Sequence, residues 1–186
     1  MADLTRRLAR LRVPLGFAFA ILVLWLAQPT GSTLAVGTAV AAIGELLRIW
    51  AAGHLNKSRE VTASGPYRYF AHPLYVGSSV MGVGLAIASG SLIVAALILL
   101  YLGATIGAAI SSEEAFLRSK FGDAYDRYRR GEAGSRDTAA STRAFSMAQA
   151  MANREYRAVS GLLVAVLVLC AKAAYNGAFW RAAGTH

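Results

Sequence analysis

The chain has little cysteine, little histidine and little negative charge. Its one cysteine, Cys170, lies in an apolar run, so the chain cannot form an internal disulfide framework. Its three histidines, His54, His72 and His186, are spread along the sequence, and we expect no metal site. There are 10 acidic residues against 19 basic ones, and the net charge is +9. These scarcities exclude a disulfide scaffold and argue against a metalloprotein.

Hydrophobic residues are abundant instead. They make up 56% of the 186 residues, and the mean hydropathy of +0.45 is too high for a soluble domain of this size. About 20 helical residues cross a hydrocarbon core of about 30 Å, and shorter segments need their flanking residues to span it. We predict an all-α, polytopic integral membrane protein with about five transmembrane helices. The five apolar segments lie at 13–27, 33–52, 74–89, 92–110 and 159–174.

Basic residues are distributed unevenly between these segments. Of the 19 Lys and Arg residues, 17 lie before the first segment, around the 53–73 loop or in the 111–157 segment, and only Lys172 and Arg181 lie elsewhere. Loops rich in Lys and Arg stay in the cytoplasm, so these regions and the N-terminus are predicted to be cytoplasmic. The positive charge attracts anionic membrane lipids, and nucleic acid is not an expected partner. The pattern does not indicate an oligomeric state.

The chain changes character near residue 133 within a single predicted domain. Residues 1–133 form the predicted membrane core, and residues 134–186 contain an amphipathic segment and the last transmembrane helix. Small polar residues at 135–140 are typical of a linker. The stretch 142–157 mixes apolar and basic residues, and it suits either a helix on the membrane surface or a disordered cytoplasmic segment.

Glu45 and Arg48 are ionisable residues near the end of the second apolar segment. They are three positions apart, so they share a helix face and can pair. Either the pair reaches the cytoplasmic interface, or it lines a cavity inside the protein. The fourth apolar segment carries Gly103 and Gly107 in a GxxxG spacing, which favours close packing of this helix against another.

The loop before the third apolar segment is rich in aromatic residues and contains histidine and proline. It reads GPYRYFAHPLYVGS from Gly65 to Ser78. Pro73 suits the first turn of a helix, which would place His72 at the helix start beside backbone N–H groups that favour an anion. An aromatic belt at the membrane interface is the alternative interpretation of its tyrosines.

Two adjacent carboxylates follow the fourth apolar segment. Glu113 and Glu114 are unfavourable at the C-terminal end of a helix unless the helix continues or a cation binds them. Apolar residues recur at helical spacing after them, which predicts that the helix continues to a turn near Gly122. The pair then either belongs to a site or lies on a solvated face.

In order and spacing, these motifs resemble the isoprenylcysteine carboxyl methyltransferase family, within the wider group that includes phospholipid N-methyltransferases. The resemblance runs from about Gly44 to Arg130 and covers GELLRIWAAGHLNKSREVTASGPYRYFAHPLYVGS, GVGLAIASGS and EEAFLRSKFGDAYDRYRR. It implies an integral-membrane methyltransferase that uses S-adenosyl-L-methionine. The implied acceptor is a lipid-like or prenylated small molecule, most like isoprenylcysteine carboxyl O-methylation. The alternatives are N-methylation of a phospholipid headgroup and a membrane protein that keeps the fold without activity.

The resemblance also implies roles for individual residues. It assigns the cofactor to the loop, a glycine pair and the acidic pair, namely Tyr67, His72, Pro73, Leu74, Tyr75, Gly82, Gly84, Glu113 and Glu114. It implies His72 and Arg68 as catalytic residues, His72 as a base for an amine acceptor and Arg68 as a replacement for a family arginine. The family usually has arginine directly before the His-Pro, where this chain has Ala71, and the prenylcysteine enzymes also have an arginine about a turn before the acidic pair, where this chain has Ala109. We expect the cofactor to come from the cytosol and the acceptor to arrive sideways from the membrane.

Overall fold

The computed structural model describes residues 19–56, 62–123, 126, 130 and 144–178. All regular secondary structure in these residues is helical, which confirms the predicted all-α class. A helical stretch at 19–26 comes first. It is followed by α2 (Gly31–His54), the short 3-10 helix η1 (Gly65–Arg68), α3 (Pro73–Ala88), α4 (Leu92–Phe121), α7 (Met147–Ala152) and α8 (Tyr156–Tyr175).

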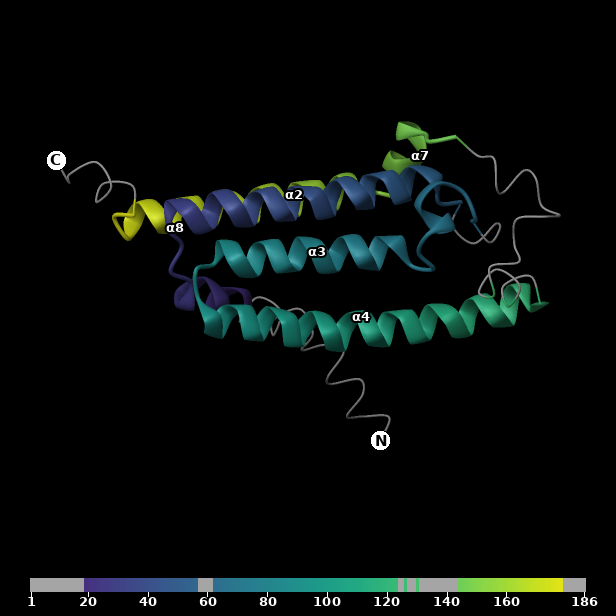
Figure 1. Cartoon of the computed structure of the whole chain (residues 1–186), viewed down its shortest axis with the longest axis horizontal. Coiled ribbons are helices and arrows are strands. Elements are labelled where there is room, and N and C mark those ends of the chain that lie inside the picture. The colour runs from purple at the N-terminus through teal and green to yellow at the C-terminus, as the bar shows by residue number, and fades with distance from the viewer. Residues whose placement is uncertain (1–18, 57–61, 124–125, 127–129, 131–143, 179–186) are drawn as a thin grey trace.

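The long helices lie roughly along a common axis in Figure 1. The helix α3 lies between α2 and α4, and α8 runs alongside α2. Successive long helices run in opposite directions, so the end of α2, the start of α3, the last turns of α4 and α7 gather at one end of the bundle (Figure 1). The described parts of the 53–73 loop and of the 111–157 segment therefore share one end, as the charge distribution predicts.

Three of the described helices are long and apolar enough to cross a membrane, namely α2 with 24 residues, α4 with 30 and α8 with 20. This corrects the prediction of five spans. The third predicted segment forms α3, whose 16 residues rise about 24 Å, less than the hydrocarbon thickness of about 30 Å. Pro73 begins α3, and a turn at Gly90, whose φ of +63° favours glycine, follows its end. Of the first predicted segment, residues 13–18 lie outside the described residues.

Four glycines bring α2 and α3 into backbone contact. Gly37 and Gly44 lie on α2, and Gly77 and Gly84 lie on α3. A Cβ atom added to Gly37, Gly44 or Gly84 would overlap the backbone of the facing helix. Small residues permit this close approach, and the backbones then gain packing contacts that bulkier residues would prevent. The helix α3 is therefore held firmly on its α2 side.

A buried charged cluster joins α2, α3 and α8. The Arg48 Nε donates to Oε1 of Glu155, the N-cap residue of α8, at 2.7 Å, and the guanidinium also donates to Ser78 on α3. The same Nε lies 3.5 Å from Oε2 of Glu45, which confirms the predicted pair. Glu45 and Glu155 are only 5% and 6% exposed. The pair is therefore enclosed by helices and does not reach out to the interface.

The short helix α7 covers the C-terminal end of α2. The Asn153 side-chain amide donates to the carbonyls of Ala52 and Leu55 at 2.8 and 2.9 Å. The Gln149 amide donates to the Leu55 carbonyl at 2.9 Å. A helix leaves its last carbonyls without partners in its own backbone, and these side chains supply them.

In the described part of the 142–157 stretch, the helix before α8 has only six residues and contacts α2, and a turn at Arg154, with φ +62°, leads into α8. Its place on the membrane surface stays a prediction. Residues 135–140, the predicted linker, lie outside the described residues.

The prediction of close packing at Gly103 and Gly107 is also wrong for the part of the chain that the structure describes. A Cβ atom added to either glycine would meet no described atom within 4 Å outside its own helix. Only Val94 is buried along the whole of α4. The GxxxG face of α4 therefore points away from the described bundle.

Candidate functional site

His72 and two glutamates form a polar cluster where the start of α3 meets α4. His72 is the N-cap residue of α3. Its Nε2 lies 3.3 Å from Oε1 of Glu114, and its Nδ1 lies 3.8 Å from Oε2 of Glu113. The side chain of His72 is 13% exposed, that of Glu114 22% and that of Glu113 41%. The imidazole is thus held between two carboxylates that solvent can still reach.

The length of α4 brings these groups together. As predicted, α4 continues beyond its apolar part through both glutamates to Phe121, and it ends at Gly122, whose φ is +48°. Because α3 and α4 are antiparallel, the start of α3 lies beside this polar continuation (Figure 1). The buried Pro73 occupies the first turn of α3 and pre-sets the backbone for the helix start. His72 is therefore placed by the proline, and the carboxylates are placed by the continuous helix.

Tyr75 extends the cluster from the first turn of α3. Its ring centroid lies 5.9 Å from that of His72, and the Glu113 carboxylate is a near neighbour of its side chain. The cluster therefore combines an imidazole, a phenol and two carboxylates, a set that favours a cationic or donor-rich ligand.

The start of α3 offers fewer backbone donors than the sequence suggests. Pro73 has no N–H group, and the N–H groups of Tyr75 and Val76 both donate to the His72 carbonyl, at 3.0 and 3.1 Å. The N–H group of Leu74 is the remaining donor of this turn. This helix end can therefore contribute one backbone hydrogen bond to a bound anion, which is a smaller anion site than expected.

The loop before α3 is attached to the end of α2 by a second histidine. His54 Nδ1 hydrogen-bonds the Ser64 hydroxyl at 3.1 Å. The ring of His54 packs directly against Gly65, whose φ of +55° favours glycine. The next turn, η1, carries Tyr67, which is half-buried, and Arg68, which is exposed. The predicted roles of these two residues, cofactor contact and catalysis, stay predictions.

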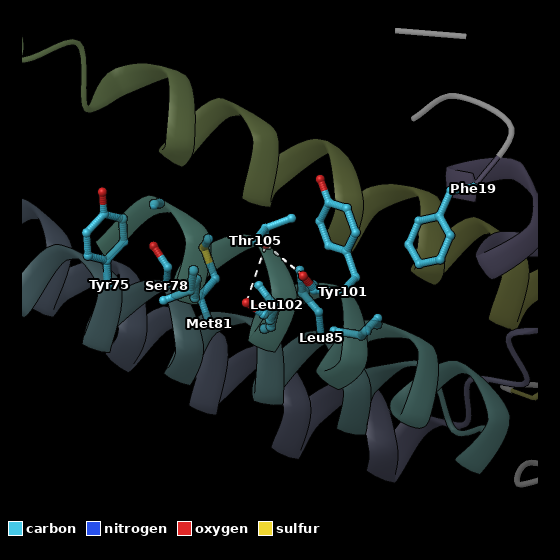
Figure 2. Close-up of a pocket in the computed structure, with 12 residues that line it drawn as sticks. Phe19, Tyr75, Ser78, Met81, Leu85, Tyr101, Leu102 and Thr105 are labelled. Carbon is cyan, nitrogen blue, oxygen red and sulfur yellow. Dashed lines mark hydrogen bonds between the residues drawn. The ribbon is translucent and has the colours of Figure 1, made fainter. Parts of the chain in front are cut away.

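An apolar cavity of about 440 Å³ lies between α3 and α4. Tyr75 lines one end, and Figure 2 shows Tyr75, Ser78, Met81 and Leu85 in succession along α3. At the other end the ring of Phe19 stacks on that of Tyr101, with centroids 5.3 Å apart. The lining comprises Phe19, Tyr75, Ser78, Met81, Gly82, Leu85, Ile98, Tyr101, Leu102, Thr105, Ile106 and Ala109.

Aliphatic hydroxyl groups in this lining are bonded to their own helices. The Ser78 hydroxyl donates to the Leu74 carbonyl at 2.9 Å. The Thr105 hydroxyl donates to the Tyr101 carbonyl at 2.7 Å, one of the dashed lines in Figure 2. None of the lining residues is charged. Because the aliphatic hydroxyls already have acceptors and the other residues are mostly apolar, the cavity suits a hydrocarbon chain.

The two glycines that were predicted to contact the cofactor lie on different faces of α3. Gly82 faces Leu102 of α4 and lines the cavity, whereas Gly84 packs against the backbone of Ala41 on α2. Positions two apart on a helix point in nearly opposite directions, so the two glycines do not line a common space here, and their contact with the cofactor stays a prediction. Gly82 is also about 15 Å from His72 along α3. Gly82 therefore belongs to the cavity, and Gly84 belongs to the α2 contact.

Several cavity residues were missed by the sequence analysis. Ser78 and Met81 follow Tyr75 at intervals of three, which is the spacing of one helix face. That periodicity would have identified them once Tyr75 was placed at a site. The bond from Arg48 to Ser78 had no such signal, because it joins residues 30 positions apart on two helices.

Comparison with known proteins gives three findings. The model of the phospholipid methyltransferase family matches residues 15–124. The chain is 36% identical over 75 residues to a protein-S-isoprenylcysteine O-methyltransferase of Schizosaccharomyces pombe, a match that covers 40% of this chain and 32% of that protein. It is 32% identical over 108 residues to the nickel-cobalt-cadmium resistance protein NccN of Alcaligenes xylosoxydans xylosoxydans, covering 57% of this chain and 49% of that protein. The chain thus spans about a third and about half of these two relatives. No solved structure matches it.

Proposed function

The chain belongs to the phospholipid methyltransferase family, and on this premise we propose that it is an integral-membrane methyltransferase that uses S-adenosyl-L-methionine and acts on a lipid-like acceptor. The observation that carries this proposal is the cluster of His72, Glu113 and Glu114 beside the Tyr75 end of an apolar cavity. All four residues lie within the matched range 15–124. A polar site for a charged cofactor thus adjoins an apolar site for a lipid chain.

The residues of the cluster fit the charges of this cofactor. S-adenosyl-L-methionine carries two positive groups, an ammonium and a sulfonium, and one carboxylate. Glu113 and Glu114 supply negative charge for the ammonium, and the N–H group of Leu74 can donate to the carboxylate. Tyr67 and Tyr75 offer aromatic faces for the adenine ring or the sulfonium. Pro73 contributes by holding the start of α3 in place.

The protein's task in methyl transfer is mainly alignment. The cofactor supplies a methyl group that its sulfonium already activates, so the acceptor atom must be held in line with that methyl. The apolar cavity orients the acceptor by its chain and keeps water from its reacting head. A carboxylate acceptor needs no base, and Arg68 is the proposed cation beside it. An amine acceptor must be neutral, and His72 is then the group placed to take its proton.

We propose an isoprenylcysteine-like carboxylate as the acceptor. Similarity to the isoprenylcysteine O-methyltransferase of Schizosaccharomyces pombe supports this choice. A headgroup amine is the second candidate, because Ala71 and Ala109 stand where the prenylcysteine enzymes have arginine. Ala109 lines the cavity, and no charged side chain in the lining replaces the missing arginine. A neutral amine does not need the cation that a carboxylate needs.

The orientation in the membrane is part of the same proposal. The end of the bundle that holds His72 also holds the described residues of the 53–73 loop and of the 111–157 segment, two regions whose sequences are rich in basic residues, so we place it in the cytoplasm. The first apolar segment and α3 would enter the bilayer together with the three candidate spans. Because α7 and α8 both pack on α2, we also treat 1–133 and 134–186 as one domain.

Binding of the cofactor to glutamate variants tests the site. Glu113→Gln and Glu114→Gln should each weaken binding of S-adenosyl-L-methionine by about 10- to 100-fold, because a hydrogen bond to a charged group contributes about 1.5–3 kcal/mol. Asp126→Asn is the matched control, since Asp126 pairs with Arg118 in solvent at the same end of α4. It should change affinity less than about fivefold. Calorimetry on the detergent-solubilised full chain measures all three.

Two results would separate the parts of this proposal. Equal affinity of the two glutamate variants, the control and the parent would show that the cluster is not the cofactor site. A parent chain that binds no cofactor at millimolar concentration would overturn the enzymatic proposal and favour a fold kept without activity. Methyl transfer to an S-alkylated cysteine and to phosphatidylethanolamine, measured side by side, decides between the two acceptors.

A further inference from the structure

A second apolar cavity, of about 320 Å³, adjoins the first one at Leu85 and Ile98. These two residues, one from α3 and one from α4, line both cavities. The second cavity is formed by the helical stretch 19–26, α3, α4 and α8. Its lining comprises Ala20, Ile21, Val23, Leu24, Leu85, Ser89, Ile98, Ala165, Val168 and Leu169.

We propose that the two cavities form one channel for the hydrocarbon chain of the acceptor, with Leu85 and Ile98 at the joint and α8 as the wall of its far end. A channel of limited length would let this protein select acceptors by the length of their hydrocarbon chain. The proposal rests on the proposed function, because that function places the acceptor's head beside Tyr75 and His72.

The chemistry of the second lining supports a hydrocarbon occupant. Nine of its residues are apolar, and the tenth, Ser89, donates its hydroxyl to the Ala86 carbonyl at 2.6 Å. The lining therefore offers a ligand no free hydroxyl donor and no charge. Because the acceptor's chain comes from an equally apolar bilayer, the protein favours one chain length through how completely that chain fills the two cavities.

The rise of α3 along the channel gives the length of hydrocarbon chain that the channel can hold. From Tyr75 to Leu85 the helix α3 rises about 15 Å, and from Tyr75 to Ser89 it rises about 21 Å. An extended chain with C–C bonds of about 1.5 Å advances about 1.3 Å per carbon. The first cavity therefore accommodates about 12 carbons, and the whole channel accommodates about 16.

The far wall of the channel is specific to the C-terminal part of this chain. Ala165, Val168 and Leu169 lie on α8, outside the range 15–124 that the family model matches. Leu169 is buried in a core cluster with Ala27 and Leu34, so this wall is fixed to the bundle. The selection of chain length is therefore assigned to a helix outside that matched range.

Paired acceptors of different length test the channel. S-decyl- and S-hexadecyl-N-acetylcysteine share one head, and only the second reaches beyond Leu85. With the full chain in lipid nanodiscs, the KM for methyl transfer and the equilibrium binding of the tritiated thioethers are both measured. At equal mole fraction in the nanodisc lipid, the parent should prefer the hexadecyl compound by about 10-fold, since the decyl chain leaves the second cavity unfilled.

Substitutions in α8 test whether the chain-length preference depends on the second cavity. Ala165→Trp fills the second cavity and should raise KM and Kd for the hexadecyl compound by about 10-fold without changing those for the decyl compound. Val168→Trp, at a partly exposed lining position, should also raise KM and Kd for the hexadecyl compound. It replaces the first variant if that one folds poorly. Ala171→Trp is the control, because Ala171 is exposed on α8 and lies outside the lining.

The possible results distinguish a failure of the channel proposal from a failure of the proposed methyltransferase function. A parent that transfers methyl groups to both thioethers with equal KM overturns the channel and leaves the proposed function standing. The channel is also overturned if the two lining variants keep the chain-length preference of Ala171→Trp. A parent that binds the hexadecyl compound more tightly but methylates neither overturns the proposed function and supports the channel.

Discussion

The two sides of α3 are built in opposite ways. Toward α2, glycines bring the two backbones into contact, and Arg48 adds a bond to Ser78. Toward α4, larger side chains surround a cavity of about 440 Å³. In the most apolar 18-residue stretch of α2, 33% of the residues are buried, whereas in that of α4 only 6% are buried. One side of α3 is thus closed by packing, and the other side is open to a ligand.

This difference shows how one helix can serve as both support and binding wall. Ser78 is the clearest example, because it accepts a hydrogen bond from Arg48 on the α2 side and also lines the cavity. The tight side prevents movement of α3, so the residues on the open side keep their positions when a ligand enters. The following predictions test whether stability is concentrated on the closed side.

Removal of the Arg48 charge should have the largest effect. Arg48→Met leaves Glu45 and Glu155 buried without their cation, which typically costs about 3–5 kcal/mol. Arg118→Met, which breaks the exposed pair with Asp126, should cost about 0–1 kcal/mol. The free energy of unfolding in mixed micelles measures both. Equal losses for the two variants would show that the buried cluster does not hold the helices together.

A side chain at the glycine contact should have the next largest effect. Gly84→Val pushes into the α2 backbone at Ala41 and should destabilise the protein by about 3 kcal/mol. Gly103→Val adds the same atoms on α4 where no described atom is near, and valine is no worse than glycine in a helix, so stability should change by less than about 0.5 kcal/mol. The same unfolding measurement compares them. A larger loss for Gly103→Val would reverse the assignment of the closed and open sides.

The cap on α2 should contribute less than the glycine contact. Asn153→Ala removes bonds to two carbonyls, Ala52 and Leu55, and should cost about 1–2 kcal/mol. Gln149→Ala removes one bond to Leu55, which keeps its bond from Asn153, so it should cost about 0.5 kcal/mol. Hydrogen exchange at the end of α2 should rise in the same order. If exchange is unchanged in both variants, α7 does not stabilise this helix end.

The outer face of α4 should give the smallest effect, and with the opposite sign. Gly107→Ala should stabilise the chain by about 0.5 kcal/mol, because alanine favours a helix over glycine and no described atom obstructs its methyl group. Thermal unfolding of the purified protein measures the change. A clear loss of stability would mean that another molecule occupies this face.

The sequence analysis succeeded where the signal was local. The helix through Glu113 to Gly122, the start of α3 at Pro73 and the pairing of Glu45 with Arg48 all depend on residues close in sequence. Among the described residues, the GxxxG spacing at Gly103 and Gly107 has no packing partner, because a small-residue spacing shows where helices can approach but does not show which helices meet. A second pattern was available, since the contacting glycines on α2 and on α3 are each seven residues apart.

By itself the sequence determined the helical class, the apolar segments and the positions where helices begin or turn, because these follow from composition and backbone chemistry. Only the tertiary structure decided which groups meet. His72 and Glu114 are 42 positions apart, and Arg48 and Glu155 are 107 apart. Their contacts arise because antiparallel helices of unequal length align particular turns. That alignment depends on how the glycine faces of α2 and α3 pack, and a spacing within one helix does not show which other helix it meets.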